Sequence, residues 1–174
     1  MKKILLNIAI IASIYGCSFP KFSFKPAGKG NQKEIPAKSI QIDFFENSSA
    51  LASSTVSSSF TEYLRDLMQS QTSLNLVSED GDVVFYGTIK KYSISPINIQ
   101  AETESAAQNR LTMVVAVNEY FPLIDSMAMN NHNFSAFVDY NSTEDFISIE
   151  ETLIESLNYQ LTQDIFDKAF GGEW

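Results

Sequence analysis

Residues that could do acid–base, nucleophilic or metal chemistry are few in this sequence, and their spacing does not bring them together. His132, within Asn130–Asn133, is the only histidine, so no second imidazole completes a zinc site, and no glycine loop binds phosphate. Glu150 and Glu151 are adjacent and do not face each other on a helix, which makes them a solvated cap. The acidic run Glu79–Asp82 lacks the length of an EF-hand loop. We therefore expect no enzyme, no catalytic residue, no metal and no cofactor.

The one cysteine, Cys17, is the residue whose surroundings do indicate chemistry. Lys2 and Lys3 precede an apolar run from Ile4 to Ile14, which is shorter than the roughly 20 residues that span a bilayer. A basic start, a short apolar segment and a small residue at the cut site are typical of a secretory signal peptide. Ile14-Tyr15-Gly16-Cys17 resembles the lipobox of bacterial lipoproteins, although Tyr15 is bulkier than usual.

This motif predicts cleavage after Gly16 and acylation of Cys17, which becomes the new N-terminus. The signal peptide would cover residues 1–16, and the lipid would attach the mature protein to a membrane. The alternative is a buried amphiphilic N-terminal helix that contains a cysteine by chance.

Composition and charge limit the remaining classes. The chain has 174 residues and a net charge of −9, which becomes −11 once Lys2 and Lys3 are removed with the signal peptide. From Ser39 onward five basic residues face twenty acidic ones, the wrong sign for a nucleic-acid partner. The mature length corresponds to one domain, and no thiol remains for a disulfide if Cys17 is acylated.

Residues 17–38 form a predicted tether, because prolines and glycines interrupt them and no apolar period supports a helix or strand. Its lysines could meet anionic head groups, or the segment could be a solvated linker; they are Lys21, Lys25, Lys29, Lys33 and Lys38. The aromatic residues Phe19, Phe22 and Phe24 alternate with polar ones and could dock on the domain or a partner as a short strand.

Hydrophobic periodicity predicts the elements of residues 39–174. Strands are expected at 39–44, 83–95, 111–117 and 134–140, with a short apolar piece at 74–77. One helix should begin near Ser53 or Ser54 and carry an apolar stripe to Met68. The last helix should begin at Ser148 in a capping box with Glu151 and stop at Gly171.

Two finer features belong to the long strand. The apolar phase shifts at Lys90–Lys91, which predicts a β-bulge, and Pro96 should end regular pairing. The order strand, helix, several strands, helix favours an α+β fold. We expect a mainly antiparallel sheet of about four strands with two helices packed on one face.

Several stretches, in their order and spacing, resemble the LptE family of lipopolysaccharide-assembly lipoproteins in its Bacteroidota form. No single stretch is specific, but together they cover nearly the whole mature chain. They are Cys17 with Phe22–Phe24, Ser39–Asn47, Ser58–Leu64, Gln71–Val77, Gly81–Gly87, Tyr92–Pro96, Asn109–Thr112 and Asp164–Ala169.

The resemblance implies a lipoprotein on the periplasmic face of the outer membrane. It would plug the large β-barrel LptD, help that barrel assemble and assist delivery of lipopolysaccharide to the outer leaflet. The family fold, two helices on a four-stranded sheet, agrees with the pattern above. Ser18 after the lipidated cysteine favours the outer membrane in the proteobacterial sorting scheme.

Direct contact with lipopolysaccharide should use cations against phosphates, and the domain has few. Lys90, Lys91 and Arg110 are the candidates, although protection of a strand edge or ordinary surface charge is the simpler explanation of such residues. Two other functions stay open. A lipid- or glycan-binding lipoprotein without a barrel would show an apolar pocket or an aromatic row, for which Phe121, Phe134 and Phe137 are the candidates. A surface hydrolase would need titratable groups that converge in a cleft.

Overall fold

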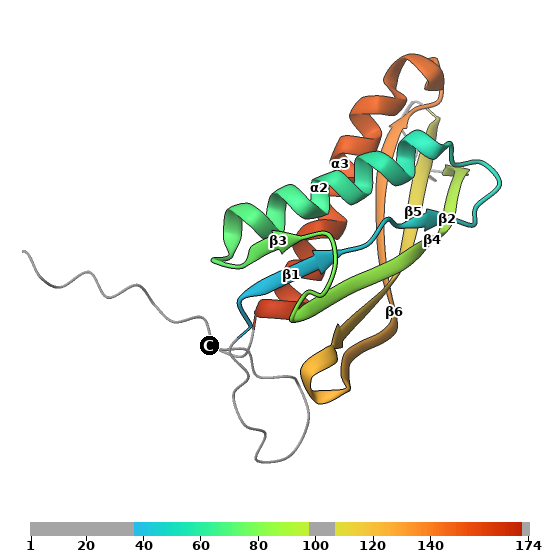
Figure 1. Ribbon diagram of the computed structural model, residues 1–174. Helices are drawn as coiled ribbons and strands as arrows, with labels where there is room; N and C mark the ends of the chain where they lie inside the picture. Colours follow the sequence, from blue (N-terminus) through green and yellow to red (C-terminus); the bar gives the residue numbers. More distant parts are fainter. Residues whose placement is uncertain (1–36, 98–106, 172–174) are drawn as a thin grey trace, which may run out of the picture.

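The computed structural model describes residues 37–97 and 107–171 (Figure 1). The signal peptide, Gly16, Cys17, the three tether phenylalanines and almost all of the tether lie outside these ranges. None of the described helices is long and apolar enough to cross a membrane. The elements, in chain order, are β1 (Ser39–Ile42), β2 (Glu46–Asn47), α2 (Ser54–Gln71), β3 (Asn75–Val77), β4 (Val83–Ile97), β5 (Gln108–Phe121), η1 (Pro122–Ile124), β6 (Ser126–Asn141) and α3 (Phe146–Phe170).

The fold is α+β with two long helices and a mixed sheet, which corrects the expected sheet in two respects. The sheet has six strands in the order β3-β1-β4-β5-β6, with β2 also paired to β4, instead of about four. Strand β1 lies parallel to both β3 and β4, and β2 lies parallel to β4; only β4–β5 and β5–β6 are antiparallel. The parallel pairs arise because α2 carries the chain from β1 back across the sheet, as a crossover must.

Both helices pack on one face of the sheet, as predicted (Figure 1). The apolar stripe of α2 is fully buried at Val56, Phe60, Leu64 and Met68. The stripe of α3 is fully buried at Leu157, Leu161 and Ile165. Burial of each such side chain contributes about 1.5–3 kcal/mol, so the helices depend on the sheet and the sheet on the helices.

The long strand β4 bears out one prediction and overturns another. Its register against β5 shifts between Ile89 and Lys91, which confirms the bulge. The expectation for Pro96 is wrong, because Pro96 still pairs with Asn109 and β4 continues to Ile97. A proline is tolerated in a strand when its missing N–H faces away from the neighbouring strand, and β2 pairs with β4 only as far as Ile89.

Helix α2 begins at Ser54 as predicted, but neither helix has the predicted side-chain cap. Ser53 is the N-cap of α2, but its side chain makes no capping hydrogen bond. Helix α3 begins at Phe146 after Asp145, so the capping box of Ser148 and Glu151 is wrong. The Ser148 hydroxyl lies inside the first turn and donates to the carbonyl oxygen of Asp145 at 2.7 Å. A short polar side chain near a helix start has this local acceptor as an alternative to the cap.

Candidate functional site

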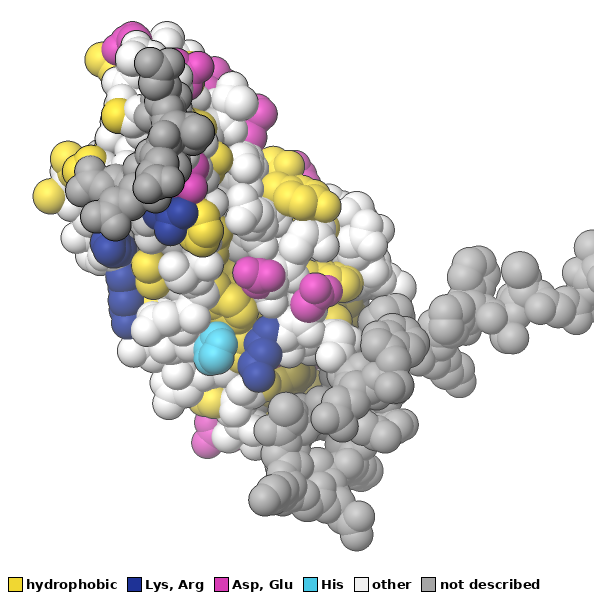
Figure 2. All heavy atoms as spheres, turned by 180° about the vertical axis from the view of Figure 1, so that it is seen from behind, with side chains coloured by type: hydrophobic (Ala, Val, Ile, Leu, Met, Phe, Trp, Pro, Cys, Tyr) yellow, Lys and Arg dark blue, Asp and Glu magenta, His cyan; other side chains and the backbone are white. Residues whose placement is uncertain are grey.

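The face of the sheet opposite the helices is where the predicted contact residues lie. Along β5 the side chains of Arg110, Thr112 and Val114 alternate with buried neighbours that point toward the helices. Their partners on β4 and β6, Ser95 and Asp139 among them, share this uncovered face. Seen from behind, the molecule mixes hydrophobic, basic, acidic and neutral polar side chains, with no large area of one kind (Figure 2).

Arg110 lies in a neutral ion pair on this face. Its Nε and Nη2 donate to Oδ1 and Oδ2 of Asp139 at 2.7 and 2.8 Å, across directly paired positions of β5 and β6. The guanidinium also stacks 3.7 Å above the ring centre of Phe137. The hydrogen bond that Arg110 donates to Asp139 raises the pKa of Arg110 and lowers the pKa of Asp139. Because Asp139 already neutralises the guanidinium, Arg110 has no unpaired charge available for a phosphate.

Lys90 and Lys91 are exposed at the bulge of β4, where a bulge turns consecutive side chains outward. The Lys90 ammonium donates to Oδ1 of Asn131 at 2.8 Å, across the width of β5. Asn131 takes a left-handed backbone conformation (φ 49°), and its N–H donates to Oδ1 of Asn118 at 2.8 Å. Neither lysine forms an ion pair with any carboxylate in residues 37–97 or 107–171.

The three predicted contact residues do not converge on one ligand. Lys91 pairs with Val114, which is four residues from Arg110 along β5, a separation of about 14 Å. With Arg110 held by Asp139, a single phosphate would not contact both Arg110 and Lys91. The contact of these residues with lipopolysaccharide stays a prediction.

His132 lies in β6, the edge strand of the sheet, opposite Val117. It is exposed, and its ring contacts Phe134 edge-on with 4.8 Å between ring centres. Across residues 37–97 and 107–171, no three histidine, cysteine, aspartate or glutamate residues gather where a metal ion could be held.

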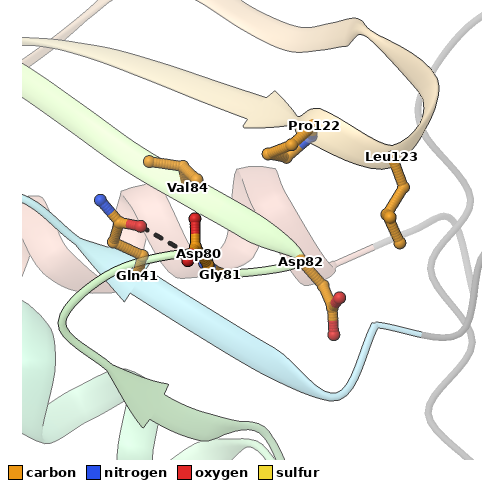
Figure 3. Close-up of a pocket in the computed structure, with 7 residues that line it drawn as sticks. All are labelled: Gln41, Asp80, Gly81, Asp82, Val84, Pro122 and Leu123. Carbon is orange, nitrogen blue, oxygen red and sulfur yellow. Dashed lines mark hydrogen bonds between the residues drawn. The ribbon is translucent and has the colours of Figure 1, made fainter.

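The acidic run 79–82 has a structural role at the start of the domain. The Asp82 carboxylate accepts hydrogen bonds from the backbone N–H groups of Lys38 (2.8 Å) and Ser39 (3.0 Å), and the first of these is the main cause of its lowered pKa. Beside it is a hollow of about 340 Å³, shown in Figure 3. Its lining comes from β1, the 80–82 turn, β4 and η1, and the side-chain oxygen of Gln41 accepts from the Gly81 N–H at 3.3 Å.

Glu119 is a buried charge that the sequence pattern did not single out. It lies on the helix-facing side of β5, paired with Phe85 and Met129, and only 2% of its surface is exposed. Burial raises its pKa to about 8, and no described hydrogen bond reaches its carboxylate. It is therefore protonated at neutral pH. The sequence feature that could have revealed it is its position among the alternating apolar residues Val115, Val117 and Phe121, where a buried side chain is expected.

A family model described as LptE, lipopolysaccharide assembly, matches residues 37–169, which includes every described helix and strand apart from the last residue of α3. The chain belongs to the LptE family. No curated protein sequence matches it.

Three solved structures illustrate what the LptE-family chain is similar to. A minor lipoprotein from Acinetobacter baumannii is 12% identical, with a TM-score of 0.49 over 77% of this chain and 91% of that one. Lipoprotein B from Nitrosomonas europaea is 12% identical, with a TM-score of 0.47 over 75% and 81%. The rare lipoprotein B from Shewanella oneidensis is 13% identical, with a TM-score of 0.42 over 74% and 89%. The family assignment rests on the family match alone.

Proposed function

We propose that this chain is an outer-membrane lipoprotein that plugs the LptD β-barrel and helps it assemble for lipopolysaccharide transport to the outer leaflet. The observation that carries the proposal is the family match over residues 37–169. In this proposal Cys17 bears the lipid after cleavage behind Gly16, the domain lies on the periplasmic side, and the family form is that of Bacteroidota. No catalysis is involved.

The dimensions of the domain suit a plug. Helix α3 has 25 residues and is about 37 Å long, and β5 with 14 residues extends about 47 Å. Both lengths exceed the roughly 30 Å thickness of a bilayer core. With α3 and β5 along the barrel axis, the domain can therefore fill the lumen over the full thickness of the membrane.

The surface of the domain also suits a lumen, which is polar in membrane barrels. The uncovered sheet face offers hydroxyl, amide and paired charged groups in place of a concave apolar site. Beside the Arg110–Asp139 pair, Asn133 and Ser135 are exposed and Thr88 and Thr112 are half-buried. Such a face can hydrogen-bond to a polar wall over a broad area, with no ligand pocket.

Within the proposed function, Lys90 and Lys91 are better placed than Arg110 to meet lipopolysaccharide phosphates. Both are exposed, and neither has a carboxylate partner among the described residues. Arg110 would have to leave Asp139 first, which costs two short charge-assisted hydrogen bonds.

No observation favours the alternative of a lipid- or glycan-binding lipoprotein that acts without a barrel. The proposed aromatic row is absent, because Phe121 and Phe134 are buried. Phe137 is half-exposed, but the guanidinium of Arg110 already covers one face of its ring. Two carboxylates, Asp80 and Asp82, line the described hollow, but the Asp82 carboxylate is already engaged by the backbone N–H groups of Lys38 and Ser39.

Site-specific photo-cross-linking in living cells tests the proposal. A photoreactive amino acid replaces Thr112 or Ser135 on the uncovered sheet face, in the full-length lipoprotein. One dominant adduct that contains the LptD barrel is the expected result, and it should vanish when the barrel is depleted. No adduct, or adducts with many unrelated envelope proteins, would contradict the proposal.

A further inference from the structure

The tip of the β5–β6 hairpin is an exposed apolar surface at the end of the domain from which the tether leaves. The tip is defined here as Leu123, Ile124 and Met127, whose exposed fractions are 67%, 40% and 37%. Leu123 and Ile124 belong to the short helix η1, and Met127 follows it in β6. Exposed apolar side chains that lie together on a surface commonly mark a site of contact with a protein or a membrane.

Two hydrogen bonds fix the conformation of the turn at the tip, in which these side chains are exposed. Asp125 has a left-handed backbone conformation (φ 48°), and its N–H donates to the carbonyl oxygen of Pro122 at 3.3 Å. The Asp125 carboxylate accepts from the hydroxyl of Tyr120 at 2.8 Å. The one acidic group of the turn is therefore engaged with its own hairpin, and the apolar side chains need no rearrangement to contact a partner.

The first residues of the domain lie beside this tip. Leu123 and Asp82 line the same hollow, and Asp82 accepts hydrogen bonds from the backbone of Lys38 and Ser39 (Figure 3). The chain that leads back toward Cys17 thus leaves the domain within one small hollow of Leu123. A surface that holds Cys17 therefore lies within the length of the tether from the hairpin tip.

The length of the tether limits how far the lipid on Cys17 can lie from the hairpin tip. Twenty residues separate Cys17 from Ala37, and a chain of that length has an end-to-end distance of about 25 Å as a flexible coil and at most about 70 Å when extended. A lipid in the membrane therefore raises the local concentration of lipid surface at the tip to the millimolar range. At such a concentration three apolar side chains need only a weak affinity to stay bound.

We propose that the hairpin tip rests on the lipid leaflet that holds the Cys17 lipid, with Leu123, Ile124 and Met127 inserted at the boundary between the head groups and the acyl chains. The inference rests on the lipid anchor of the proposed function and not on the barrel. Amphipathic surface elements insert in this way to a depth of about 5–10 Å.

The opposite end of the molecule provides the matched control. Ile147, in the first turn of α3, is 81% exposed. The ring of Phe170, in the last turn of α3, contacts Phe85 at the other end of the helix. About 35 Å of helix separates Ile147 from the last turn of α3. When the hairpin tip contacts the leaflet, the exposed side chain of Ile147 is therefore far from the lipid.

Tryptophan fluorescence in vesicles tests the proposal on the full acylated chain. Trp174, the only native tryptophan, is replaced by phenylalanine, and the variants Leu123→Trp, Met127→Trp and Ile147→Trp are compared on this background. The protein is reconstituted into phosphatidylethanolamine vesicles with a quarter phosphatidylglycerol, whose acyl chains carry bromine. Quenching of at least twofold is expected for Leu123→Trp and Met127→Trp, with little for Ile147→Trp.

The outcomes separate this inference from the proposed function, because flotation of the vesicles reports the anchor independently. Protein that floats while both tip variants stay unquenched overturns the leaflet contact and leaves the anchor intact. Equal quenching at all three positions also overturns it, because the domain then has no preferred end toward the lipid. Protein that fails to float overturns the anchor together with the contact.

Discussion

Glu119 allows the packing of the helices on the sheet to be tested through pH. Replacing Glu119 by glutamine keeps the size and shape of the side chain and removes its titration. In the folded chain burial raises the pKa of Glu119 from 4.5 to about 8, and its side chain is 2% exposed. The variant should therefore change how stability depends on pH more than it changes the structure.

The sign and size follow from proton linkage. Between pH 4.5 and 8 the unfolded chain releases the Glu119 proton while the folded chain retains it, so the free energy of unfolding falls as pH rises. The two pKa values differ by about 3.5, and each pH unit corresponds to 1.36 kcal/mol, which gives a loss of roughly 5 kcal/mol at most. Below pH 4.5 the residue has no effect, and above pH 8 the loss is complete.

Urea unfolding followed by circular dichroism at pH 5, 7 and 9 measures this effect. Relative to Glu119→Gln, the wild-type protein should lose several kcal/mol between pH 5 and 9. Glu155→Gln, at an exposed position of α3, is the matched control and should follow the wild-type profile. Parallel profiles for wild type and Glu119→Gln would show that the carboxylate is solvated and that the packing described at β5 is incorrect.

Three further substitutions test separate parts of the account. Gly87→Ala should unfold the protein or cost about 3 kcal/mol in urea unfolding, because the added methyl would meet the carbonyl oxygen of Ala116 and lie 2.6 Å from the Phe45 ring; an unchanged midpoint would contradict it. Asp82→Ala should cost about 1 kcal/mol by the same assay through loss of the two backbone hydrogen bonds, and an effect on membrane attachment would be unexpected. Cys17→Ser should move the protein from the membrane to the soluble fraction, and mass spectrometry of the wild type should show an acylated N-terminus at Cys17 in place of Met1.

The sequence predicted the features of this fold that depend on neighbouring residues. The apolar stripe from Val56 to Met68, the stripe of the last helix and the bulge at Lys90–Lys91 all follow from local periodicity, and the structure has them. These features depend on which side of a single helix or strand is apolar, and the sequence of that element alone determines this.

Pairing between distant residues could not be predicted in the same way. The parallel contacts of β1 with β3 and β4 depend on the path of α2, and the Arg110–Asp139 pair depends on the register of β5 against β6. The capping box failed because two competing local hydrogen bonds differ little in energy, and Asp145 starts the helix instead. Glu119 was detectable only by asking why a carboxylate occupies an apolar position of a strand.

Purification of the native complex tests the central claim most directly. The full-length lipoprotein is extracted from its own outer membrane in mild detergent and isolated through a C-terminal tag, and its partners are identified and quantified by mass spectrometry. The account predicts one large β-barrel protein, LptD, in equal amount with the lipoprotein. Recovery of the lipoprotein alone, or in large excess over any barrel, would contradict it.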